Sequence, residues 1–118
     1  MQNQDSTPGV IRKKQSQLDC ITITSVILPA VRASVAEKLL QMGYGQESIA
    51  KELGIAQAAV SKYKNQRYSE KIKHIKNYID EGKLYTGIIE SIETKKGKEN
   101  VEKDINSLCE NLIAYCNS

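Results

Sequence analysis

A short polar stretch near the middle of the chain offers side chains that can hydrogen-bond to the edges of nucleic-acid bases. Gln57 carries an amide, Ser61 a hydroxyl and Lys62 an ammonium group. An amide can make paired hydrogen bonds to adenine in the major groove of DNA, and the methyl of Ala58 can touch a thymine methyl. Gln46 can add a hydrogen bond to a phosphate. These residues predict recognition of DNA, provided that a helix presents them on one side.

Residues 46–65 have the pattern of two short helices joined by a tight turn. Ile49 and Leu53 lie on one side of a first helix, over roughly 46–53, and the small Ala50 lets a second helix cross close to it. Gly54 stands where the chain must leave that helix with a positive φ. A second helix, over roughly 57–64, has an apolar side made of Ile55, Val60 and Tyr63. The pattern predicts a helix-turn-helix, with a purely structural helical hairpin as the alternative.

The run Gln-Glu-x-Ile-Ala-x-x-Leu-Gly-Ile-x-Gln-x-x-Val-Ser, which starts at Gln46, resembles a known motif. It is similar to the core of the lambda-repressor/Cro-type (XRE-like) helix-turn-helix regulators. The wider stretch from Leu28 to Tyr63 resembles a group of small archaeal predicted transcriptional regulators, and the resemblance covers roughly residues 20–66. It implies a sequence-specific DNA-binding regulator in which Gln46 and Gln57 are the strongest candidates for DNA contacts, followed by Ala58, Ser61 and Lys62.

Two positions depart from that family pattern. Ser or Thr is common before each helix of the motif as an N-cap, whereas Gly45 and Ala56 stand there in this chain. Glycine is a tolerable cap, but the methyl of Ala56 cannot accept a backbone hydrogen bond, which forgoes about 1 kcal/mol of helix stability. Neither departure alters the predicted base-facing residues.

Positive charge gathers beside the predicted recognition helix. The formal net charge of +3 is too small to indicate a partner. Its distribution is more informative, because one 26-residue stretch holds only Glu52 and Glu70 against Lys51, Lys62, Lys64, Arg67, Lys71, Lys73 and Lys76. Such a surplus can neutralise phosphates, and Lys64, Asn65 and Arg67 are placed to do so just beyond the helix. A solvated lysine-rich face is the alternative.

Length and composition favour one all-helical domain with a short appended element. The 118 residues include neither Phe nor Trp, and a core of Ile, Leu, Val, Ala and Tyr suits closely packed helices. The apolar stretch 21–31 is far short of the ~20 residues of a membrane helix, and the polar start has no secretory pattern. Three scattered cysteines make no disulfide framework. We therefore expect a cytoplasmic protein.

The chain divides into three parts. Residues 1–17 predict a flexible tail, in which Arg12, Lys13 and Lys14 offer a basic arm for DNA as the less favoured interpretation. Residues 18–68 form the predicted DNA-binding domain. It would begin with a helix over 21–27 and a second one started by Pro29, whose stripe is Val31, Val35, Leu39 and Met42.

The apolar pattern of residues 69–118 predicts a C-terminal helical region. Ser69 begins a helix that ends at Gly82, with Ile72, Ile75 and Ile79 on one side, and a further helix spans 84–94 with Leu84, Ile88 and Ile92. The last helix, over 99–116, has a heptad-like seam of Val101, Ile105, Leu108, Leu112 and Tyr115. This seam can pack on the protein's own core or on a second copy. We expect a homodimer held by the last helix, because paired recognition helices about 34 Å apart would read a palindrome.

Residues suited to catalysis or metal binding lack partners. Cys109 and Cys116 would lie about 10.5 Å apart on a helix, so a metal or redox site would need Cys20 or a second subunit. Packing is the more ordinary role for such cysteines. His74 has no carboxylate or cysteine nearby in the sequence, and we expect no enzyme, no cofactor and no metal.

The sequence thus predicts a transcriptional regulator that reads double-stranded DNA, with repression by promoter occupancy favoured. Two alternatives stay open. One is a protein-interaction module, an adaptor or antitoxin-like partner that uses the same helices. The other, which the archaeal resemblance suggests, is a regulator whose cysteines sense a metal or redox state.

Overall fold

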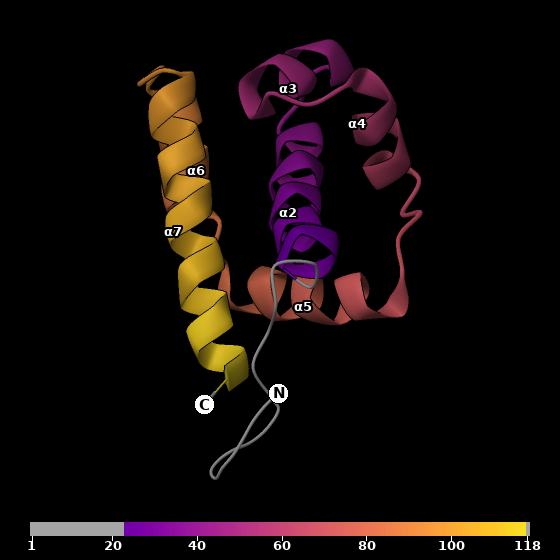
Figure 1. Cartoon of the computed structure of the whole chain (residues 1–118). Coiled ribbons are helices and arrows are strands. Elements are labelled where there is room, and N and C mark those ends of the chain that lie inside the picture. The colour runs from indigo at the N-terminus through magenta and orange to yellow at the C-terminus, as the bar shows by residue number, and fades with distance from the viewer. Residues whose placement is uncertain (1–22, 118) are drawn as a thin grey trace, which may run out of the picture.

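All regular structure in the computed structural model, which describes residues 23–117, is helical, as the sequence predicts (Figure 1). No helix within that range is both long and apolar enough to cross a membrane. The elements are a π-helical turn η2 (Ile23–Ile27) and the helices α2 (Leu28–Gln41), α3 (Gln46–Leu53), α4 (Gln57–Lys64), α5 (Glu70–Gly82), α6 (Thr86–Glu93) and α7 (Lys98–Asn117).

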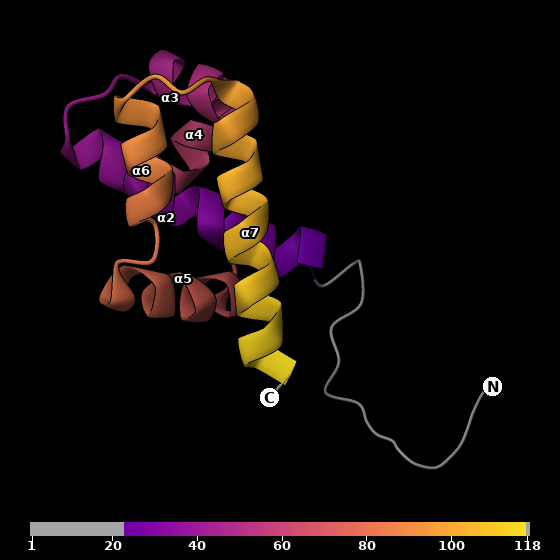
Figure 2. The ribbon, with the colours of Figure 1, turned by 90° about the vertical axis from the view of Figure 1, so that its left-hand side faces the viewer.

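Helix α2 is the centre of the fold, and helices α3 to α7 all contact it (Figures 1 and 2). It begins with Pro29 in its first turn, as predicted. A helix that is buried nearly all round must have neighbours on every side, and in α2 the small residues let those neighbours approach closely. Its buried positions are Ala30, Val31, Ala33, Ser34, Val35, Ala36 and Leu39. Met42 was predicted to extend this stripe, but it lies beyond the end of the helix and is 38% exposed.

Helix α5 lies across one end of α2 (Figure 1), and its predicted start and end are both confirmed. The Ser69 hydroxyl accepts a hydrogen bond from the Ile72 N–H at 3.3 Å, which caps the helix. The next helix starts later than predicted, at Thr86 and not at Leu84. Leu84 lies in the turn before α6 and is 39% exposed, so its predicted place in the apolar stripe was wrong.

Helix α7 runs beside α6 and packs on α2, α3 and η2 (Figure 2). The Ser91 hydroxyl of α6 donates a hydrogen bond to the Asp104 carboxylate of α7. The predicted seam is turned inward and belongs to the same hydrophobic core as α2 and α4. Its buried members are Val101, Ile105, Leu108 and Leu112.

The last member of the seam behaves differently. Tyr115 is 54% exposed, and its ring stacks on that of Tyr78 from α5, with the ring centroids 4.3 Å apart. Of the two possibilities for the seam, packing on the protein's own core is therefore the one observed over most of its length. A second copy would have to use another surface of α7.

Candidate nucleic-acid interface

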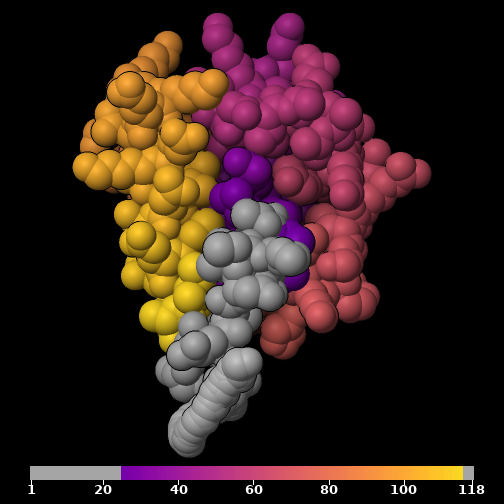
Figure 3. Space-filling model, in the orientation of Figure 1, coloured from indigo at the N-terminus to yellow at the C-terminus, as the bar shows by residue number. Residues whose placement is uncertain are grey.

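Helices α3 and α4 have the predicted bounds and are joined by a turn at Gly54. This glycine has a φ of 67°, in the left-handed region that favours glycine, as the sequence predicts. The Gly54 and Ile55 N–H groups donate to the carbonyls of Lys51 and Ala50, which closes the end of α3. The turn sets α4 at an angle to α3, so both helices form the outer surface at one end of the molecule (Figures 1 and 3).

The apolar side chains of these helices fix how α4 sits on the rest of the protein. Ile49 and Val60 are completely buried, and Leu53 and Tyr63 are nearly so. Burial also raises the pKa of the Tyr63 hydroxyl, and the positive charge of Arg32 opposes that rise. Helix α4 packs on both α2 and α3. Its outward side is therefore held in a defined orientation.

The predicted contact residues mostly lie on that outward side. Ser61 and Gln46 are half-buried, so their side chains have less reach than the others. The exposed ones are Gln57, Ala58, Lys62 and Lys64 of α4, with Asn65 and Arg67 in the segment that follows. Seven of the eight predicted residues thus gather on α4 and the segment just after it, and Gln46 lies apart at the start of α3.

Comparison with protein-family models, with curated proteins and with solved structures finds no match for this chain.

Both helices begin without a side-chain cap, as expected from Gly45 and Ala56. The Ile49 N–H donates to the Gly45 carbonyl, and the Ala59 N–H donates to the Ala56 carbonyl. The earlier amides of each helix have no side-chain acceptor. Uncapped N–H groups and the positive end of the helix dipole favour an anion at these positions.

The basic surface beside α4 is smaller than the sequence suggests. Lys51, Lys71 and Lys73 are exposed, as a phosphate-binding surface requires. Lys76 is not, because only 6% of it is exposed and its ammonium faces inward. Its predicted place among the phosphate-facing cations was therefore wrong.

Lys76 instead joins α5 to α2 through a network of charges. Its Nζ lies 2.8 Å from Oε1 of Glu37 and 2.6 Å from Oδ2 of Asp80, and the Tyr68 hydroxyl donates to Oε2 of Glu37 at 2.8 Å. Burial alone would lower the pKa of Lys76, but the hydrogen bonds and charges of Asp80 and Glu37 raise it above its usual value. Burial and the contact with Glu37 raise the pKa of Tyr68 as well. The network ties the segment after α4 to the central helix.

A sequence signal for this buried lysine existed. Lys76 falls four residues after Ile72 and three before Ile79, on the apolar stripe of α5, and Asp80 follows one helical turn later. A lysine at such a position is buried with a partner. The sequence does not reveal Glu37 as the second partner, because it lies 39 residues away.

The cysteines do not form a metal site in the part of the chain that the structure describes. No group of three or more His, Cys, Asp or Glu residues in that part could hold an ion. Cys109 is buried, and burial raises the pKa of its thiol, which makes it less reactive. His74 is exposed on α5. Cys20, the side chain of Cys116 and the basic tail at 12–14 lie outside the described residues.

Proposed function

We propose that this protein is a sequence-specific DNA-binding transcriptional regulator whose helix α4 enters the major groove. The observation that carries the proposal is the division of α4 into two sides. Val60 and Tyr63 anchor one side in the core, while Gln57, Ala58 and Lys62 face solvent on the other. A helix presented in this way can place an amide, a methyl and an ammonium against base edges and phosphates.

The surroundings of α4 support the same proposal. Lys64 and Arg67 are exposed directly after the base-reading positions, where contacts to the phosphate backbone would set the register. The uncapped start of α3, with Gln46, offers amides to a further phosphate. Repression is the favoured mode, because a regulator that occupies a promoter needs only the DNA-binding surface.

The experiment is a fluorescence-anisotropy titration of the full chain across a salt series. One duplex is the region upstream of the protein's own gene, and the other is a scrambled duplex of equal length. We expect tighter binding to the native duplex that persists at moderate salt, because base contacts depend less on released counterions than phosphate contacts do. Equal and salt-sensitive binding to both duplexes would contradict base readout of this region. A partner protein that co-purifies in equal amount, with no DNA preference, would replace the proposal by the protein-interaction alternative.

A substitution at Gln57 separates base reading from simple attraction. Gln57→Ala should weaken binding to the cognate duplex by roughly 1–3 kcal/mol and relax specificity at one base pair, since an amide that contacts a base carries sequence information. Gln41→Ala is the matched control, because Gln41 is an exposed glutamine at the end of α2. An equal loss for Gln57→Ala on cognate and scrambled DNA would remove Gln57 from the base-reading set.

A homodimer is part of the proposal. One short recognition helix makes few base contacts, and a second copy on a palindrome would supply the rest. The buried seam of α7 packs on the protein's own core, so we expect a second copy to use the stacked and partly exposed rings of Tyr78 from α5 and Tyr115 from α7. Sedimentation of the full chain at micromolar concentration should give a dimer mass that Tyr115→Ser lowers. A monomer mass for the unaltered chain would contradict dimerisation.

A further inference from the structure

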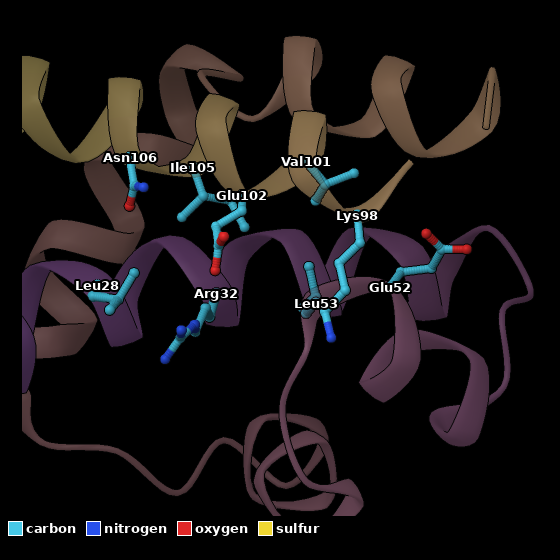
Figure 4. Close-up of a pocket in the computed structure, with 9 residues that line it drawn as sticks. All are labelled: Leu28, Arg32, Glu52, Leu53, Lys98, Val101, Glu102, Ile105 and Asn106. Carbon is cyan, nitrogen blue, oxygen red and sulfur yellow. The ribbon is translucent and has the colours of Figure 1, made fainter. Parts of the chain in front are cut away.

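A cavity of about 180 Å³ lies between helices α2, α3 and α7 (Figure 4). Aliphatic side chains from all three helices line part of it, including Leu28, Leu53 and Ile105. A cavity of about 150 Å³ in a protein core is large enough to hold a benzene molecule. This cavity therefore has room for one small organic molecule.

Arg32 of α2, which lines this cavity, has no partner in the part of the chain that the structure describes. Its Nε is fully buried and makes no hydrogen bond, and the guanidinium forms no ion pair. Its positive charge nevertheless acts on two buried groups, because it opposes the rise in the pKa of the Tyr63 hydroxyl and of the Cys109 thiol. Burying an unpaired donor of a charged group is costly, which makes Arg32 the unusual residue of this site.

The other charges around the cavity have both signs and are not paired with each other. Glu102 reaches from α7 toward α2, and Glu52 lies on α3, but neither forms an ion pair within the described range (Figure 4). Lys98 of α7 does have an environment that suits its charge. A Cβ placed on Gly54 would lie 3.4 Å from the Lys98 Nζ, so the ammonium lies at the C-terminal end of α3, where the helix dipole favours a cation. Arg32 is left without such a contact.

We propose that this cavity binds a small zwitterion of the α-amino-acid class with an aliphatic side chain. Its carboxylate would pair with the Arg32 guanidinium, its ammonium with Glu102, and its side chain would lie on the aliphatic wall. A dianion would be repelled by the two glutamates, and an uncharged molecule would leave Arg32 unpaired. A zwitterion avoids both problems, because its carboxylate pairs with Arg32 and its ammonium pairs with Glu102.

A ligand in this cavity would lie against α3, one of the two helices that the proposed function uses. Glu52 of α3 and Lys98 of α7 line the cavity beside the last turn of α3, next to the Gly54 turn that orients α4. Any effect of the ligand on DNA rests on the proposed function. Binding itself does not, because it is measured on the free chain.

The test follows the Arg32 side chain directly by nuclear magnetic resonance. The standard α-amino acids are added in pools, and then singly, to the full ¹⁵N-labelled chain, and the Arg32 Nε–H signal is recorded. Arg32→Gln identifies that signal by its disappearance. We expect one or a few aliphatic amino acids to shift it in a saturable way, together with amides of α7 near Glu102.

Matched probes then separate the two charges. For leucine, the matched molecules are 4-methylpentanoate, which lacks the ammonium, and 3-methylbutylamine, which lacks the carboxylate. Each should bind about tenfold more weakly or worse than the zwitterion, since each loses a hydrogen bond between charged groups. Glu102→Gln should reduce binding of the amino acid, whereas binding of the carboxylate alone should stay unchanged or become tighter, because a like charge is removed.

If no pool shifts the Arg32 signal, the cavity binds none of these amino acids and the proposal is wrong. Equal binding of the amino acid and of the matched carboxylate would overturn the zwitterion in favour of a simple anion. Lys38→Gln, a change at a half-buried position of α2 outside this cavity, is the control variant and should bind as the unaltered chain does.

Discussion

Helix α2 contacts one cation from α5 and carries another of its own, and the surroundings of the two differ in one decisive respect. On one side, Lys76 of α5 is almost fully buried and makes ion pairs with Glu37 and Asp80. On another side, Arg32 has a buried Nε and no partner within the described residues. A buried charge with several short contacts is explained by the fold that it supports. A partly buried charge without contacts has no such explanation. Lys76 is therefore a residue that the fold needs, whereas Arg32 is one that a ligand could use.

The largest expected effect comes from breaking the paired side. Lys76→Met should lower the free energy of unfolding by about 3–5 kcal/mol, because it leaves Glu37 inside the protein without its cation. Chemical denaturation measures the loss. Lys73→Met, an exposed lysine on the same helix, is the control and should change stability by less than about 0.5 kcal/mol. Similar losses for the two variants would mean that the network contributes nothing to stability.

Alkaline pH should act on the same network, with a smaller effect. The pKa values of Lys76 and Tyr68 are raised in the folded protein, so their stabilisation is complete below the unfolded values, near 10, and is lost as the pH rises through the folded ones. In that window the unfolded chain releases a proton that the folded protein keeps, so each of the two groups lowers the free energy of unfolding by about 1.4 kcal/mol per pH unit. Denaturation at a series of pH values above 9 should give a steeper fall for the unaltered chain than for Lys76→Met. Parallel curves would contradict this assignment.

The smallest effect is expected on the unpaired side. Arg32→Met should leave the free energy of unfolding within about 1 kcal/mol of the unaltered value or raise it, because no ion pair is lost and a buried donor without a partner disappears. The same denaturation series measures it. A loss of about 3 kcal/mol or more would show that Arg32 supports the fold as Lys76 does, and the contrast between the two sides would fail.

Local patterns in the sequence predicted the helices well, but they predicted burial near the helix ends less well. The bounds of α3 and α4 and the φ of Gly54 follow from residues that are neighbours in the chain. Met42, Leu84 and Tyr115 were placed in apolar stripes because of their spacing, yet each lies at or beyond the end of a helix and is exposed. Spacing tells which side of a helix a residue faces, but not whether a neighbouring helix extends far enough to cover it.

The charged sites show a second limit on what can be predicted from the sequence. The exposed side of α4 could be predicted, because a short amphipathic helix hides its apolar residues. The partners of Lys76 and the isolation of Arg32 could not, since they depend on how α2, α5 and α7 cross. Glu37, for instance, contacts Tyr68 and Lys76 because α5 packs on α2, although both residues are far from it in the sequence.

The uncapped starts of α3 and α4 have a consequence for how the protein would meet its partner. Amides at the first turn of a helix exchange their hydrogens readily with solvent when nothing accepts from them. Glu47 and Ser48 should therefore exchange quickly in the free chain, and a phosphate seated there would slow them without moving the backbone. Replacing Gly45 by serine would add about a few tenths of a kcal/mol of stability to α3, but its hydroxyl would then compete with DNA for the same amides. The protein would become more stable and a poorer binder through the same atoms.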